Sequence, residues 1–196
     1  MQQLPHCAPL CIFEHRRDST LRSRGIKQRI VVKLLASLQV ADVTRGVLAK
    51  CLAAELGIPR ANAYQYAYKE LEECLIPNGI VEETGTTILP TRGPGQLQNA
   101  GIPCYSLTGL GMLVASTLEE LGIEKQKELL KRHLACSKVS SAAEFAANEW
   151  LGSTLRKHPE YAIKLAGNCV RDFVQGKSAH PLDAIMNDTK TWINDW

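Results

Sequence analysis

The sequence predicts a mainly α-helical protein that carries one small two-stranded β-sheet. Three observations predict this fold class. Over most of the 196-residue chain, apolar residues recur at a helical spacing. Two short segments, 80–84 and 102–107, are instead rich in β-branched and aromatic residues, as strands are. The segment 53–63 combines small residues with Gly57 and Pro59, a composition typical of a tight turn between two helices.

The first half of the chain divides into an arm and two helices. Residues 1–24 contain prolines and cations without sustained periodicity, and we expect an irregular, basic N-terminal arm there. A helix is expected over 25–39 because its aliphatic residues share one face: Ile26, Ile30, Val31, Leu34, Leu35 and Leu38. A minimal strand could follow at 40–43. Thr44 should cap a second helix, which ends at Gly57 because glycine adopts the left-handed conformation without a Cβ penalty.

A third helix is expected from Pro59 to about Leu75. Proline suits a first helical turn, where its missing N–H would have no partner. Ala63 and Ala67 should face the core, and because two alanines fill little volume, a neighbouring tyrosine could fold inward beside them. The residues expected on the outer face are Arg60, Asn62, Tyr64, Gln65 and Lys69.

The two expected strands are separated by a loop rich in turn residues, 90–96, which carries the cation Arg92. Thr108 is the candidate N-cap of a helix that reaches Leu121. Further helices are expected over 123–136, 141–156, 158–176 and from 180 to the end, and a capping box at 141–144 opens the second of these. Trp192 and Trp196 share a face of the last helix, which either packs on its own core or binds a partner.

Three helices followed by a two-stranded wing is the order of a winged helix-turn-helix. With the Tyr-x-Leu-Thr-x-x-Gly pattern at 105–111, residues 26–121 resemble the DNA-binding domain of PadR-like and MarR-like prokaryotic transcription regulators. The resemblance covers about half of the chain. It implies a winged-helix domain over 25–121, an all-helical module over 122–196, and a dimer that binds double-stranded DNA. Pro59 departs from the pattern, since these families usually place Ser or Thr there.

The charge distribution is uneven although the net charge is only +3. Residues 14–33 hold seven Lys or Arg against two Asp or Glu, whereas residues 69–83 hold one against five. The basic segment could face phosphates, or it could be a solvated tail. The expected DNA-binding residues are Arg60, Asn62, Tyr64, Gln65 and Lys69 on the third helix, Arg92 on the wing, and Arg16, Arg17, Arg22 and Arg24 on the arm.

Two other functions stay open. Residues 26–108 hold eight cations and seven anions, a near-neutral balance that suits a protein-interaction module in a nucleoprotein assembly. A thiol or metal sensor could use His6, Cys7, Cys11 and His15, but their spacing matches no established motif, and we expect no metal and no cofactor. The seven cysteines include no Cys-x-x-Cys pair, so most should be reduced and buried.

Several function classes lack their motifs. The phosphate-binding loop, the dinucleotide fingerprint and the nucleophile elbow do not occur, and the carboxylates at 70–73 fit a solvated helix face better than a catalytic pair. We therefore expect a protein that is not an enzyme. No apolar run is long enough to span a bilayer and the first residues do not form a signal peptide, so the expected location is cytoplasmic.

Overall fold

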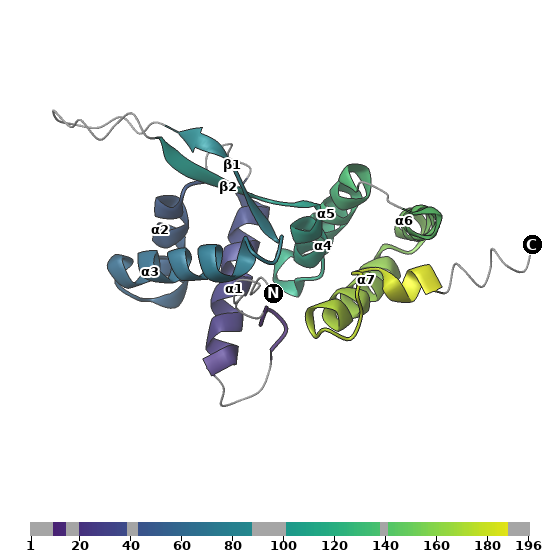
Figure 1. Ribbon diagram of the computed structural model, residues 1–196, viewed down its shortest axis with the longest axis horizontal. Coiled ribbons are helices and arrows are strands. Elements are labelled where there is room, and N and C mark those ends of the chain that lie inside the picture. Colours follow the sequence, from purple (N-terminus) through teal and green to yellow (C-terminus); the bar gives the residue numbers. More distant parts are fainter. Residues whose placement is uncertain (1–9, 15–19, 39–42, 88–100, 138–140, 188–196) are drawn as a thin grey trace, which may run out of the picture. The chain divides into compact units, whose positions relative to one another are not determined.

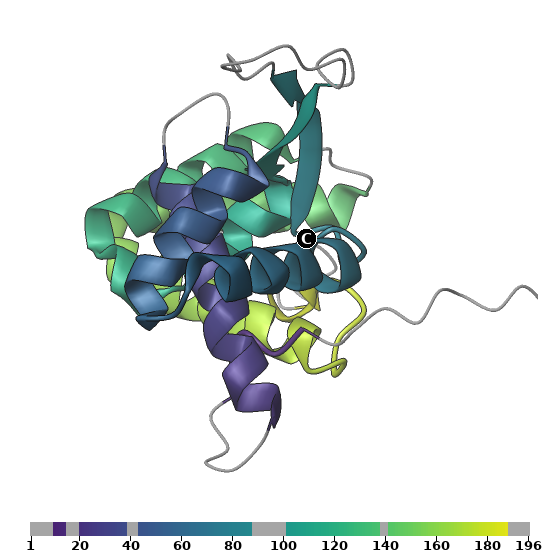
Figure 2. The same cartoon turned by 90° about the vertical axis from the view of Figure 1, so that its left-hand side faces the viewer.

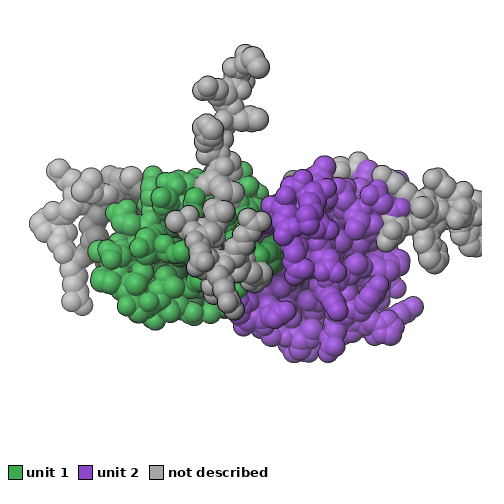
Figure 3. Space-filling view, turned by 90° about the horizontal axis from the view of Figure 1, so that it is seen from below, with its two compact units in different colours: residues 1–108 green, residues 109–196 purple. Residues whose placement is uncertain are grey.

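The computed structural model describes residues 10–14, 20–38, 43–87, 101–137 and 141–187. Within these ranges the chain is mainly helical and carries one two-stranded antiparallel sheet, which confirms the broad fold class. The chain divides into two compact units, Met1–Thr108 and Gly109–Trp196, coloured separately in Figure 3. The expected boundary at Leu121 lies later in the chain, because the helix that follows Thr108 packs against helices of the second unit.

In its described residues the first unit contains three α-helices and both strands (Figure 1). In order, they are α1 (Thr20–Ser37), α2 (Arg45–Leu56), α3 (Arg60–Glu70), the π-helical turn η1 (Leu71–Leu75), β1 (Val81–Thr87) and β2 (Ile102–Leu107). Strand β2 has the predicted limits, and β1 is longer than predicted. Helix α1 begins before the predicted start, so residues 20–24 are helical rather than part of an irregular arm. The strand expected at 40–43 lies mostly outside the described residues.

The turn between α2 and α3 forms as its sequence predicts. Thr44 caps α2, its hydroxyl accepting a hydrogen bond from the Val47 N–H. Gly57 ends the helix with φ 63° and ψ 34°, a left-handed conformation, and its N–H donates to the Ala53 carbonyl. Pro59 directly precedes α3, which has no side-chain cap at its start. Helix α3 lies across α1 in both views of the unit (Figures 1 and 2).

Small residues on α3 lie at the centre of this packing. Ala63 and Ala67 are fully buried, as expected. The tyrosines do not fill the space beside them, because Tyr64 and Tyr68 are 43% and 45% exposed and Tyr66 is half-buried. Aliphatic side chains supply the core volume instead, and the largest that are fully buried in this unit are Ile12, Leu48, Leu52, Leu71, Leu75 and Ile80.

The turn η1 continues α3 with a wider helical geometry. The Ile76 N–H donates to the Leu71 carbonyl at 2.9 Å, a bond that spans five residues. Leu71, Cys74 and Leu75 are all fully buried in this turn, while Glu73 stays exposed. The wider turn thus directs three side chains into the core at the end of the helix, before the chain enters β1.

One carboxylate of the acidic segment is buried, which corrects the expectation of a solvated face at 70–73. Glu70 is only 2% exposed. The Gln28 amide of α1 donates to Glu70 Oε2 at 3.0 Å, and Arg24 Nε lies 3.7 Å from Glu70 Oε1. A buried carboxylate requires such partners, so this contact fixes which side of α3 faces α1.

Residues 10–14, also expected in an irregular arm, pack against α1. The Cys11 N–H donates to Gln28 Oε1 at 2.7 Å, and the Arg29 guanidinium donates to the Ile12 carbonyl at 2.7 Å. Burial raises the pKa of the Cys11 thiol, although the nearby Arg24 guanidinium opposes the shift. The backbone of Cys11 comes very close to α1 at Gly25, where an added Cβ would lie 2.1 Å from the Cys11 carbonyl oxygen.

The replacement Gly25→Ala tests this close approach. Alanine normally stabilises a helix relative to glycine, but here its methyl group collides with the backbone of Cys11, and we expect a loss of about 1–3 kcal/mol. Urea unfolding monitored by circular dichroism measures it. The matched control is Gly46→Ala in α2, where the nearest atom to the added Cβ is 3.7 Å away. Equal or greater stability of Gly25→Ala would contradict the packing of residues 10–14.

The sheet joins β1 to β2 in an antiparallel register from Val81 opposite Leu107 to Thr87 opposite Ile102, with a bulge between Glu83 and Gly85. The Tyr105 N–H donates to the Val43 carbonyl at 2.9 Å, which ties β2 to the start of α2. In Figure 2 the far ends of the strands stand clear of the three helices. The Thr108 hydroxyl donates to the Gly79 carbonyl and closes the base of the hairpin.

The described secondary-structure elements of the second unit are all helical. Its elements are α4 (Gly109–Ser116), the 3₁₀ turn η3 (Glu119–Leu121), α5 (Ile123–Cys136), α6 (Ala142–Lys157), α7 (Pro159–Val174) and a helical turn at 183–187. Ser141 caps α6 by accepting the Glu144 N–H, and Pro159 occupies the first turn of α7, as predicted. Helix α4 is shorter than the predicted 108–121. Trp192 and Trp196 lie outside the described residues.

His133 of α5 is a buried titratable group in this unit. It is 7% exposed, and its Nδ1 lies 2.8 Å from the Gly109 carbonyl oxygen, so the neutral ring donates from Nδ1. Burial lowers the pKa of His133 below the ordinary 6.5; the nearby His180 adds to this, whereas the Gly109 bond and Glu144 oppose it. The folded state therefore favours the neutral imidazole.

This shift predicts acid sensitivity. The unfolded chain takes up a proton on His133 at a higher pH than the folded chain does, and this uptake favours unfolding. The free energy of unfolding should therefore be highest above about pH 6.5 and should decrease as the pH falls below that value. Urea midpoints between pH 7.5 and pH 5 measure it. His133→Gln, which can still donate to Gly109, should flatten the dependence, and replacement of the exposed His158 by Gln should not. An unchanged slope in His133→Gln would assign the acid sensitivity to other groups.

Candidate nucleic-acid interface

The structure brings more of the predicted site residues together on the outer face of α3 than on any other described element. Because successive helical residues turn by about 100°, Gln65 lies opposite the buried Ala63, Ala67 and Glu70. Five of the predicted residues are exposed on this helix: Arg60, Asn62, Tyr64, Gln65 and Lys69. The face thus offers two amides, one phenol and two cations to solvent.

The predicted cations of the arm and the wing do not all join this face. The Arg24 side chain is 24% exposed and turns toward the buried Glu70, because that carboxylate requires a partner, so Arg24 is not part of a free arm. Arg22 is in α1, but its side chain lies outside the described part of the structure. Arg16, Arg17 and Arg92 are also outside the described residues.

A cluster of aromatic and charged side chains borders one side of the outer face. Arg45, the first residue of α2, lies over the rings of Tyr68 and Tyr64, with its Cζ 4.6 Å and 5.8 Å from their centroids. Its Nη2 donates to Glu72 Oε1 at 2.8 Å and to the Tyr105 hydroxyl of β2 at 3.1 Å. We call these five residues the Arg45 cluster; it joins α2, α3, η1 and β2.

The electrostatics of the Arg45 cluster are balanced. Burial disfavours the charge of Arg45, but the hydrogen bond to Tyr105 and the proximity of Tyr64 and Glu72 outweigh it, so the pKa of Arg45 is raised. Burial raises the pKa of Tyr105 as well, although Arg45 opposes that shift. The guanidinium therefore stays charged and the Tyr105 phenol stays protonated near neutral pH.

Four residues of the cluster were not predicted as site residues from the sequence: Arg45, Tyr68, Glu72 and Tyr105. One feature of the sequence could have identified Arg45: a cation in the first turn of a helix is disfavoured by the helix dipole, so it needs a compensating partner. Nothing local in the sequence shows that this partner is Glu72, which lies far along the chain.

The opposite side of the outer face is bordered by α1. Lys27 Nζ lies 3.6 Å from the centre of the Tyr66 ring. Exposed charges along α3 are distributed unevenly: Arg60 and Lys69 lie on the helix itself, and the exposed acidic residues follow in η1 and β1, at Glu73, Glu82 and Glu83. The start of α3 is thus the end more compatible with an anionic ligand.

Other kinds of site find little support within the described ranges. No group of three or more metal-binding side chains occurs among these residues. His6, Cys7 and His15 of the possible sensor lie outside them, and Cys11 is buried. None of the described helices is both long enough and apolar enough to cross a membrane.

Comparison of the chain with protein-family models, with curated proteins and with solved structures finds no match. The geometry of the outer face and of the Arg45 cluster is therefore the basis for assigning a function.

The hydroxyl of Tyr105 should stabilise the Arg45 cluster. Tyr105→Phe keeps the ring but removes the group that bonds both Arg45 and Glu72, and we expect a loss of about 1 kcal/mol in the free energy of unfolding. The control is Tyr64→Phe, whose exposed hydroxyl should contribute less than about 0.5 kcal/mol. Equal effects of the two replacements, measured by urea unfolding, would show that the cluster is not held through Tyr105.

Proposed function

We propose that the protein is a sequence-specific double-stranded DNA-binding transcription regulator, and that its first unit is a winged helix-turn-helix. One observation carries this proposal: α3 buries Ala63, Ala67 and Glu70 and turns Arg60, Gln65 and Lys69 outward, next to a two-stranded hairpin. An exposed polar helix beside a hairpin suits insertion into a major groove.

The side chains on α3 have the chemistry that base recognition requires. The amides of Asn62 and Gln65 suit the paired donor and acceptor of adenine, and the Arg60 guanidinium suits the two acceptors of guanine. The phenols of Tyr64 and Tyr68 are exposed and can donate to phosphate oxygens. In the proposed complex, residues 60–65 lie deepest in the groove.

The charge distribution favours an orientation in which the start of α3 enters the groove. The carboxylates at Glu73, Glu82 and Glu83 would be repelled by phosphates, so η1 and the base of the hairpin should lie away from the DNA backbone. Within the Arg45 cluster, Glu72 neutralises Arg45, and Tyr64 and Tyr68 remain exposed to solvent. Backbone contacts are then expected from Arg60, Lys69 and, outside the described residues, the arm and wing cations.

A binding titration over a salt series tests this function. The preferred duplex is first selected from a random pool. The charge variants Arg60→Gln and Lys69→Gln should each weaken binding and reduce the slope of log affinity against log salt by about one if they contact phosphate. Gln65→Ala should instead relax base preference at one position, by about 1–3 kcal/mol of discrimination.

The matched control is Lys33→Gln, which makes the same change in net charge on α1, where Lys33 already pairs with Glu55 at 2.8 Å. Affinity and salt slope of this control should stay near those of the unchanged protein. Wild-type affinity and base preference in a combined Arg60→Gln, Gln65→Ala variant would remove α3 as the reading helix. A palindromic selected site would agree with the dimer that the resemblance to PadR-like and MarR-like regulators implies.

A second function is favoured by the acidic surface. Glu73, Glu82 and Glu83 give η1 and the start of β1 a negative charge that suits a basic protein partner rather than DNA. Purification of the protein from cells, followed by a test of its retention on duplex DNA, discriminates between the two functions. A stoichiometric protein partner, released by charge reversal at Glu82 and Glu83, together with no retention on duplex DNA at moderate salt, would select the protein-interaction module.

A further inference from the structure

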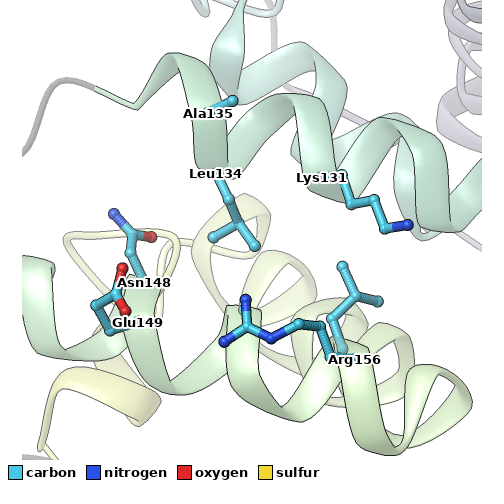
Figure 4. A pocket seen from close by; sticks show the side chains of 8 residues that line it. Lys131, Leu134, Ala135, Asn148, Glu149 and Arg156 are labelled. Atoms are coloured by element: carbon cyan, nitrogen blue, oxygen red, sulfur yellow. The ribbon is translucent and has the colours of Figure 1, made fainter.

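A pocket of about 420 Å³ lies between α5 and α6, inside the second unit (Figure 4). Its volume falls in the range of small-molecule sites. The lining combines apolar and polar groups from both helices: Lys131, Leu134 and Ala135 from α5, and Asn148, Glu149, Gly152, Leu155 and Arg156 from α6. None of these residues belongs to the surface proposed to bind DNA.

Asn148 is the most informative residue of the lining. It is 9% exposed, yet within the described part of the chain neither its amide nitrogen nor its carbonyl oxygen has a hydrogen-bond partner. Buried polar groups without partners are rare, and each one calls for an explanation such as a ligand. In Figure 4 the amide of Asn148 points from α6 toward α5, into the space that the pocket occupies.

Charged groups line other parts of the pocket, with Asn148 and Lys131 on opposite sides of it in Figure 4. Lys131 and Arg156 extend from α5 and α6, and no ion pair of either is found among the described residues. Glu149, next to Asn148 in the chain, adds one carboxylate. Leu134 and Leu155 supply an apolar wall. The lining thus offers two cations, one anion, a donor and an acceptor beside a small aliphatic surface.

We propose that this pocket binds a free α-amino acid with an aliphatic side chain. The ligand carboxylate pairs with Arg156 and accepts from the Asn148 nitrogen. The ligand ammonium group donates to the Asn148 oxygen and pairs with Glu149, and the aliphatic side chain contacts Leu134 and Leu155. Arg156, Glu149 and the Asn148 amide then each have a complement. The inference does not depend on DNA binding.

Titration calorimetry of the full chain tests this proposal with three probes of one shape. L-leucine carries both charged groups, isocaproate lacks the ammonium group, and isoamylamine lacks the carboxylate. We expect saturable heat with leucine and at least about tenfold weaker binding of each analogue, since each loses one charged contact. No saturable binding of leucine, or equal binding of either analogue, would overturn the proposal.

Single replacements in the lining test whether leucine binds in this pocket. Arg156→Gln should weaken leucine binding at least about tenfold, whereas the control Lys157→Gln, an adjacent exposed cation outside the pocket, should not. Asn148→Leu removes the buried unpartnered amide, so its melting temperature without ligand should be no lower than that of the unchanged protein, while the leucine heat disappears. Undiminished leucine binding in Arg156→Gln or Asn148→Leu would overturn the assignment of the pocket.

Discussion

The burial of one carboxylate, Glu70, governs the geometry of the first unit. A charged group inside a protein is tolerated only where hydrogen bonds and an opposite charge replace water, and here Gln28 and Arg24 of α1 provide them. Any rotation of α3 about its axis would break this arrangement. The side of α3 that faces solvent is therefore fixed by a contact on its opposite side, and Gln65 is directed outward as a result.

Much of the scaffold was predictable from the sequence because its determinants are local. The caps at Thr44, Gly57 and Ser141 depend on residues within one turn of the chain, and all three were confirmed. The outer face of α3 was also predicted, since a small-residue stripe at Ala63 and Ala67 places the larger polar residues on the other side. Local pattern and tertiary packing agree at these positions.

The remaining features depend on contacts between residues far apart in the sequence. Glu70 belongs to an acidic run that local composition assigns to solvent, and only its meeting with Gln28 makes burial possible. Arg45 and Tyr105 are likewise separated by most of the first unit, so no local pattern indicates that their side chains meet. The packing of Cys11 against Gly25 was missed for the same reason, since prolines nearby suggested an irregular arm.

The wide turn η1 also separates two parts of the scaffold that would otherwise be coupled. In an uninterrupted α-helix, the rotational phase of Tyr64 and Gln65 would fix the direction in which the chain enters β1. The π-helical turn resets that phase through its own buried residues, Leu71, Cys74 and Leu75. The exposed side of α3 and the direction of β1 are therefore each set by their own buried residues, and the Arg45 cluster is the contact that links Tyr64 and Tyr68 of α3 to Tyr105 of β2.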